Sequence, residues 1–117
     1  MKRAIVLLCL LLGILLTACG DRKITDEQAV SAVQKYCYAE MPDLEDIVKA
    51  EEYPVYWEVE SSDEKEIVVV FRSYTGAQMR YYIDRVSGDT RVTEFVPGIM
   101  TEEAPSGETL NVRDYMD

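Results

Sequence analysis

Histidine is absent from this sequence, and cysteine is scarce, with three residues in 117. Without histidine, serine–histidine and cysteine–histidine nucleophilic pairs and histidine-ligated zinc sites are excluded in their usual forms. Basic residues are also few, because 12 lysines and arginines stand against 22 aspartates and glutamates. A surface with this excess of acid repels phosphate backbones and anionic lipid headgroups. We therefore expect no nucleic-acid partner, no metal or other cofactor, and no enzymatic activity.

The amino-terminal segment has the layout of a secretory signal peptide. Two cations, Lys2 and Arg3, precede an apolar run over residues 4–16. A helix needs about 20 apolar residues to cross the hydrocarbon core of a membrane, so this run is too short for a permanent transmembrane helix. Residues 1–18 are therefore predicted to be a signal that is removed.

Leu16-Thr17-Ala18-Cys19 closes the apolar run. These residues resemble the lipobox of bacterial lipoproteins, in which a leucine, two small residues and a cysteine direct cleavage and lipidation. The resemblance implies that Cys19 becomes the first mature residue, carries a diacylglyceryl group and anchors the protein in the cell membrane, facing outside the cytoplasm. Two or more acyl chains anchor a protein stably, whereas one chain does so only marginally. Residues 19–23 are predicted to be a short tether.

Cys37 would be the only thiol of the folded part, because Cys9 lies in the signal and Cys19 is modified. An intramolecular disulfide is then impossible. Cys37 falls on the apolar side of a helical pattern, and a free cysteine commonly packs as a small hydrophobe. We expect Cys37 in the core, with an intermolecular disulfide as the alternative.

The first element of the domain is predicted to be a helix over residues 25–39. Thr25 and Gln28 have the spacing of a capping box, and Met41-Pro42 ends the pattern. Apolar residues recur at three- and four-residue steps on one stripe, at Ala29, Val30, Val33, Tyr36 and Cys37. Residues 43–50 either form a short second helix or an irregular connection.

From Tyr53 the apolar period changes from the helical spacing to two, which is typical of half-buried strands. Four strands are predicted, over residues 53–60, 66–74, 78–84 and 91–96. One helix stripe is available to cover one face of the sheet. The sequence therefore predicts an α+β domain over residues 24–97, with one amino-terminal helix packed on an antiparallel sheet of about four strands, either PepSY-like or cystatin-like.

Arg80-Tyr81-Tyr82-Ile83-Asp84-Arg85-Val86-Ser87-Gly88-Asp89-Thr90 resembles the closing hairpin of PepSY domains. The resemblance covers about residues 25–95. In such a hairpin Gly88 supplies a positive φ and Asp84 accepts hydrogen bonds from the N–H groups of the turn. The PepSY resemblance implies modulation or inhibition of an extracellular peptidase. A generic cystatin-like or NTF2-like domain is the alternative fold, and it would enclose a pocket for a small molecule or peptide.

Residues 98–117 are predicted to be an acidic, flexible tail, because Pro97-Gly98 ends the last predicted strand and acids dominate residues 101–108. Four apolar side chains near the end of this segment either dock on the domain as one hydrophobic contact or bind a partner. They are Leu110, Val112, Tyr115 and Met116.

The sheet face away from the helix is the predicted binding site, because aromatic and arginine side chains favour protein contacts. Its candidate residues are Tyr56, Arg72, Tyr74, Arg80 and Tyr82. Glu58 and Glu60 share this face as a candidate acid/base pair, although such pairs are usually only solvated. Asp84 and Asp89 are assigned to the hairpin turn rather than to a calcium loop. A non-enzymatic protein-binding lipoprotein is thus the first functional hypothesis, and a small-molecule or peptide receptor is the second.

Overall fold

Helix α2, Asp26–Glu40, begins and ends close to the predicted positions in the computed structural model, which describes residues 22–116. The predicted capping box is confirmed: Thr25 Oγ1 accepts from the Gln28 N–H at 3.1 Å, and Gln28 Oε1 accepts from the Thr25 N–H at 2.9 Å. The helix buries one stripe, made of Ala29, Ala32, Val33, Tyr36 and Cys37. The predicted signal peptide (1–18), Cys19 and the first part of the tether (19–23) lie outside the described residues.

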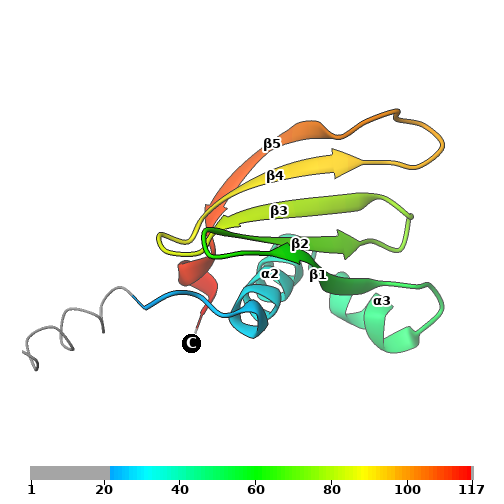
Figure 1. The fold of residues 1–117 in the computed structure, drawn as a ribbon. Coiled ribbons are helices and arrows are strands. Elements are labelled where there is room, and N and C mark those ends of the chain that lie inside the picture. The colour runs from blue at the N-terminus through cyan, green and yellow to red at the C-terminus, as the bar shows by residue number, and fades with distance from the viewer. Residues whose placement is uncertain (1–21, 117) are drawn as a thin grey trace, which may run out of the picture.

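Five strands form one antiparallel sheet in the order β1-β2-β3-β4-β5, so each strand pairs with its neighbour in the chain. The strands are β1 Tyr56–Ser62, β2 Glu66–Arg72, β3 Gln78–Asp84, β4 Asp89–Phe95 and β5 Ala104–Asn111. Figure 1 shows α2 lying against one side of this sheet, where it contacts β1 and β2. In the part of the chain that the structure describes, no helix packs on the opposite side, which we call the open face.

The core lies between α2 and the sheet. Alternate residues of β2 point to the helix, and Ile67, Val69 and Phe71 are at most 1% exposed. Their neighbours Tyr81 and Ile83 on β3 are equally enclosed, and Ile24 closes the end next to the tether. The α+β class and the antiparallel sheet are therefore confirmed.

Of the two alternatives for residues 43–50, the short second helix is confirmed: α3 spans Leu44–Ala50. The fold therefore has two α-helices in the described residues rather than one. Leu44 is 1% exposed and ties α3 to the core. Glu51 ends the helix in the left-handed region at φ 53°, and its N–H donates to the Val48 carbonyl. The short apolar pattern here is sufficient for about two turns of helix because α3 docks against α2.

The expected flexible tail over residues 98–117 is wrong in the described residues. Residues 104–111 form β5, which pairs with β4, and the 3₁₀ helix η1, Val112–Tyr115, follows directly. Val112 is fully buried, and the Tyr115 ring meets the Tyr36 ring edge-on at a centroid distance of 5.4 Å. Hydrophobic docking of η1 on α2 therefore holds a strand of weak intrinsic β-propensity in place.

Candidate protein-binding surface

The predicted binding residues all lie on or beside the open face, but they do not form one surface. Tyr56 pairs with Arg72 across β1 and β2, while Arg80 and Tyr82 lie opposite Val70 and Val68 on the adjacent strands β2 and β3. Val68 and Val70 point away from the helix and are still only 4% and 5% exposed. The polar side chains of the open face therefore cover these two valines, and part of that face is closed.

The closed part is a polar network centred on Arg80. Its guanidinium donates from Nε and Nη2 to the two carboxylate oxygens of Glu60, at 2.7 and 2.8 Å. Glu103 accepts from the hydroxyls of Tyr82 and Thr93, both at 2.6 Å, and lies 4.0 Å from Arg80 Nε. We call these five residues the Arg80 network. In this network, Arg80 and the Tyr82 hydroxyl make their hydrogen bonds within the molecule rather than with a partner.

The carboxylates of the Arg80 network are held ionised. The hydrogen bonds that Arg80 donates keep the pKa of Glu60 below its usual range. The pKa of Glu103 is also lowered, first by the hydrogen bond from Thr93 and then by that from Tyr82. A carboxylate fixed as an anion is a poor general acid near neutral pH. The arrangement thus suits structure better than acid/base chemistry between Glu58 and Glu60.

A second part of the predicted surface remains accessible. Tyr56 and Tyr74 are 42% and 43% exposed, and Tyr53, which precedes β1, is 52% exposed. The rings of Tyr53 and Tyr74 have their centroids 6.1 Å apart. Arg72 lies beside them and donates to the Pro54 carbonyl at 2.6 Å. We call Tyr53, Tyr56 and Tyr74 the tyrosine cluster.

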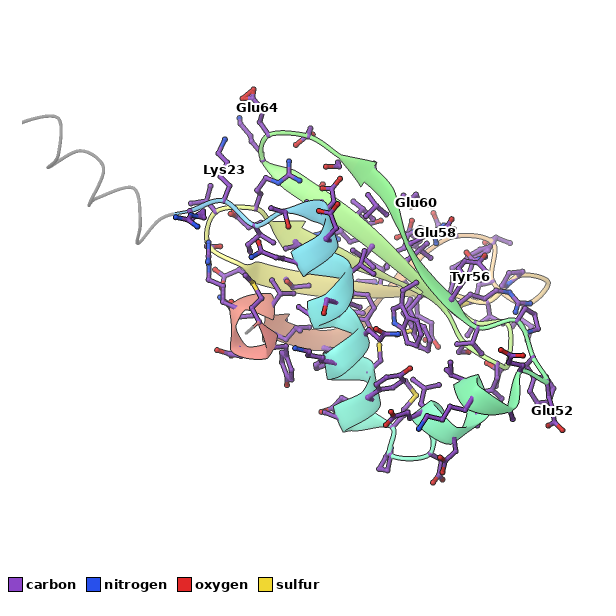
Figure 2. All side chains as sticks on the ribbon, turned by 90° about the horizontal axis from the view of Figure 1, so that it is seen from below. Lys23, Glu52, Tyr56, Glu58, Glu60 and Glu64 are labelled. Atoms are coloured by element: carbon purple, nitrogen blue, oxygen red, sulfur yellow. The ribbon has the colours of Figure 1, made fainter. Side chains whose placement is uncertain are left out.

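The predicted start of the first strand at Tyr53 is three residues too early. Strand β1 begins only at Tyr56, so Tyr53 lies in the connection from α3, where the strand alternation does not apply. The following Pro54 is the signal that the regular strand had not yet begun. Figure 2 shows Tyr56 farther from Lys23 than Glu58 and Glu60 are, on the side of the molecule where Glu52 also lies.

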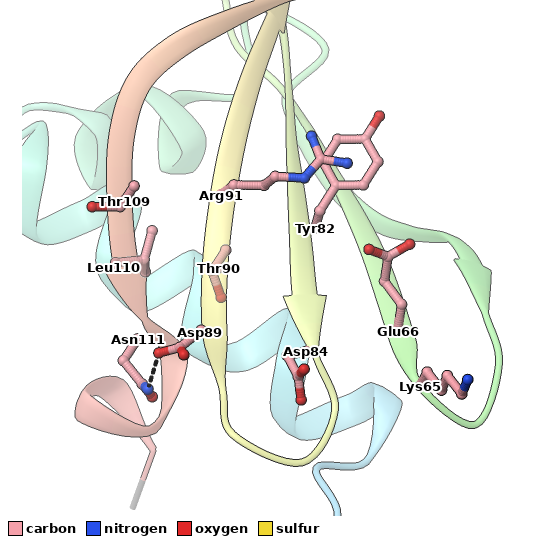
Figure 3. A pocket seen from close by; sticks show the side chains of 10 residues that line it. All are labelled: Lys65, Glu66, Tyr82, Asp84, Asp89, Thr90, Arg91, Thr109, Leu110 and Asn111. Carbon is pink, nitrogen blue, oxygen red and sulfur yellow. Dashed lines mark hydrogen bonds between the residues drawn. The ribbon is translucent and has the colours of Figure 1, made fainter.

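A shallow hollow of about 680 Å³ lies beside the β3–β4 turn, over the adjoining ends of β2, β3, β4 and β5 (Figure 3). The Arg91 guanidinium stacks over the Tyr82 ring at 3.9 Å from its centroid. Two of the three acids that line this hollow, Asp84 and Asp89, have hydrogen-bond partners. Asp84 Oδ1 accepts from the Val86 and Ser87 N–H groups at 2.9 Å, and Asp89 Oδ1 accepts from Asn111 at 3.0 Å.

The predicted roles of the hairpin residues are therefore confirmed: Asp84 bonds the turn, and Gly88 has φ +87°. Among residues 22–116, no group of three or more acidic, cysteine or histidine side chains is arranged to hold a metal ion.

The space between helix and sheet is largely filled. Cys37 is fully buried there, as expected, with its Sγ 3.4 Å from the Tyr81 hydroxyl oxygen. Burial raises the pKa of the Cys37 thiol, so the nucleophilic thiolate is disfavoured. A cavity of about 290 Å³ remains at this point, between Tyr36, Phe71 and Tyr81. This volume is at the lower limit of typical small-molecule pockets.

Comparison with family models, with curated protein sequences and with solved structures found no match to this chain. Fold and site thus define a small α+β domain, with one helical layer on a five-stranded meander and an open face. Within the described residues, the helices are too short or too polar to span a membrane.

Proposed function

We propose that this chain is a cell-envelope lipoprotein whose folded domain binds a protein partner without catalysing a reaction. Its anchor is the lipid on Cys19, in the cell membrane and facing outside the cytoplasm. The PepSY-like hairpin over residues 80–90 narrows the partner to an extracellular or envelope peptidase, which the domain modulates or inhibits.

The tyrosine cluster is the observation that carries this proposal. Tyrosines are enriched where proteins bind each other, because a rigid ring supplies large contact area and a hydroxyl supplies a hydrogen bond. Tyr53, Tyr56 and Tyr74 leave between two fifths and about half of their surface in solvent. Glu51 and Glu52 precede Tyr53 in the chain, and Glu58 follows Tyr56 by two residues, so the partner's matching surface is expected to be basic.

A small ligand held between α2 and the sheet is the second candidate. The cavity of about 290 Å³ beside Cys37 favours it, because Tyr36, Glu108 and Ser73 contribute polar groups to its lining. Under this alternative the ligand would stabilise the domain in solution, and substitutions in the tyrosine cluster would not affect its binding.

The experiment is a pull-down with the lipid-free domain, residues 20–117, from envelope and culture fluid. Mass spectrometry identifies the bound proteins, and a peptidase assay is run on the eluate with and without added domain. We expect a peptidase whose activity falls when the domain is added. A variant with Tyr53, Tyr56 and Tyr74 changed to serine should lose this partner. Full capture by that variant contradicts binding through the tyrosine cluster.

A matched control uses Val86→Ser. Val86 is 48% exposed, like the tyrosines, but it lies in the β3–β4 turn, away from the cluster. This variant should capture the partner as the wild type does. Loss of binding in both variants would indicate a general loss of exposed apolar surface rather than a specific site.

The lipid anchor has its own test. Cys19→Ala removes the thiol that carries the diacylglyceryl group, so the protein should leave the membrane fraction. Membrane association of Cys19→Ala at wild-type level would contradict the anchor and leave the binding function unaffected.

A further inference from the structure

Strand β1 is one edge of the sheet, so one side of its backbone has no neighbouring strand. The direction of its polar groups follows from the ladder. Ser73 N–H donates to the Ala77 carbonyl at the end of the β2–β3 pair, and Arg85 N–H donates to the Lys65 carbonyl at the other end. Because bonded and non-bonded pairs alternate in antiparallel sheets, Val70 and Arg72 direct their backbone groups to β1.

The partners of Val70 and Arg72 on β1 are Glu58 and Tyr56. These two residues therefore use their backbone groups inside the sheet. Trp57 and Val59, which alternate with them, direct their N–H and C=O groups to the free edge. The edge thus offers a row of main-chain donors and acceptors at strand spacing, over the part of β1 that precedes the bulge between Val59 and Ser61.

A groove runs beside this edge on the helix side. It has a volume of about 410 Å³ and lies between α2 and β1, with Val30 and Val59 as its apolar walls and Gln34 at its rim. Val59 is only half-buried, although it packs against the core. A strand added next to β1 would direct alternate side chains into this groove. Those side chains would be apolar.

The other side chains of an added strand would lie on the open face beside Glu58. This carboxylate is exposed, and Figure 2 shows it between Tyr56 and Glu60 along the strand. Glu27 of α2 also lines the groove, whereas the Asp26 carboxylate there is already paired with Arg85. Charge complementarity therefore calls for basic side chains on the added strand.

A second copy of the chain fits this edge poorly. Antiparallel pairing of two β1 strands through Trp57 and Val59 would place the two Glu58 carboxylates opposite each other, and like charges directly opposite are destabilising. Each copy also carries a net charge of −10 over the full sequence. The acidic charge at the β1 edge therefore disfavours pairing with a second copy and favours pairing with a basic segment.

We infer that the β1 edge binds an extended segment of a protein partner by strand addition, with apolar side chains in the α2–β1 groove alternating with basic side chains beside Glu58. The inference rests on the proposed function in one respect: the segment belongs to the partner that the domain binds. The new strand is expected to run antiparallel, as all neighbouring strands of this sheet do.

The test uses a synthetic peptide of about nine residues that alternates lysine with valine, which is a typical strand length. Trp57 is the only tryptophan of the chain and lies on β1, so its fluorescence reports binding at the edge. In antiparallel pairing the valines bear the amides that face Trp57 and Val59. N-methylation of the valine amides should weaken binding at least tenfold, and N-methylation of the lysine amides should change it less than twofold. Equal binding of the valine-methylated peptide, or no binding of the parent peptide, overturns the inference.

Two variants test the site from the protein side. Val59→Pro removes one N–H at the free edge and should weaken peptide binding at least tenfold. Glu58→Lys leaves the backbone intact and should weaken it about five- to tenfold through charge alone. Glu64→Lys is the matched control, because it makes the same charge change in the β1–β2 turn (Figure 2) and should not weaken binding more than twofold. An unchanged affinity of Glu58→Lys overturns the charge pattern.

The same variants separate this inference from the proposed function. If the wild-type domain captures a partner and Val59→Pro captures it equally well, strand addition fails while the binding function stands. If the wild-type domain captures no partner but binds the lysine–valine peptide as expected, the proposed function fails and the edge site stands. A β1-dependent dimer in analytical ultracentrifugation would show that a second copy occupies the edge, and would overturn the inference.

Discussion

Arg80 donates two hydrogen bonds to the Glu60 carboxylate across the open face, at 2.7 and 2.8 Å. The Arg80 side chain is only 16% exposed, whereas Glu60 keeps 43% of its side chain in solvent. A two-pronged pair of this kind fixes both side chains in direction as well as in distance. Arg80 is thus a structural residue of the open face, and its neighbour Glu103 ties the network to the segment that leads into β5.

Arg80→Gln should lower the free energy of unfolding by about 1–2 kcal/mol, because it leaves Glu60 and Glu103 close together without their shared cation. Urea unfolding followed by circular dichroism measures this change. Lys65→Gln, in the exposed β1–β2 turn, provides the control and should stay within about 0.5 kcal/mol of the wild type. An Arg80→Gln domain of wild-type stability would show that the network contributes nothing to the fold.

Gly88→Ala should be more destabilising than Gly98→Ala, although the two glycines have nearly the same φ, +87° and +86°. Both variants place a side chain in the left-handed region, at a cost of about 1–2 kcal/mol. Only at Gly88 would the new Cβ lie 2.5 Å from Asn111 Oδ1, an atom held in place by the Arg113 N–H. We expect a further loss of about 1–3 kcal/mol there. Equal midpoints of thermal unfolding for the two variants would contradict this account.

Val112→Ala should cost about 2–3 kcal/mol, since it empties a fully buried site where η1 meets α2. A flexible tail predicts no change. The exposed Val86 offers the same substitution without burial, and Val86→Ala should remain within about 0.5 kcal/mol of the wild type in chemical denaturation. Identical unfolding curves for both variants would contradict the docking of residues 104–116 on the domain.

Stability should fall at alkaline pH through Tyr36. Burial, followed by the nearby Glu108 carboxylate, raises the pKa of Tyr36 to about 12. Because the folded-state pKa is raised above the unfolded value near 10, the neutral phenol stabilises the fold fully below pH 10, and this stabilisation is lost as pH rises through about 12. Tyr36→Phe should therefore flatten the decline in the free energy of unfolding over this range. A slope equal to that of the wild type would exclude Tyr36 as its source.

Local signals explain what the sequence predicted well. The capping box of Thr25 and Gln28 and the hairpin turn of Asp84 and Gly88 each involve residues within four positions of one another. Their side chains bond the nearest backbone groups, so the pattern alone determines the geometry. The uninterrupted run of β-branched and aromatic residues over positions 67–71 likewise favours a strand, and β2 occupies that segment.

Long-range packing explains what the sequence did not predict. Strand β5 contains Pro105 and Gly107, both poor strand formers, and its place in the sheet depends on Val112 reaching the core. Glu103 belongs to the same unpredicted segment. The Arg80 network, and with it the division of the predicted binding surface into closed and accessible parts, therefore could not be read from residue spacing. Tyr53 was misplaced because the start of β1 was placed three residues too early.

The meander order of the sheet favours rapid folding of the chain. Every strand pairing joins neighbours along the chain, so each hairpin closes only a short loop, and short loops close quickly and at low entropic cost. Among the described residues, η1 makes the contacts that are most distant in sequence: Arg113 donates to the Arg22 carbonyl, and Tyr115 meets Tyr36 of α2. A chain that folds after crossing a membrane would therefore assemble its sheet hairpin by hairpin, and its last residues would complete the domain by docking on its first helix.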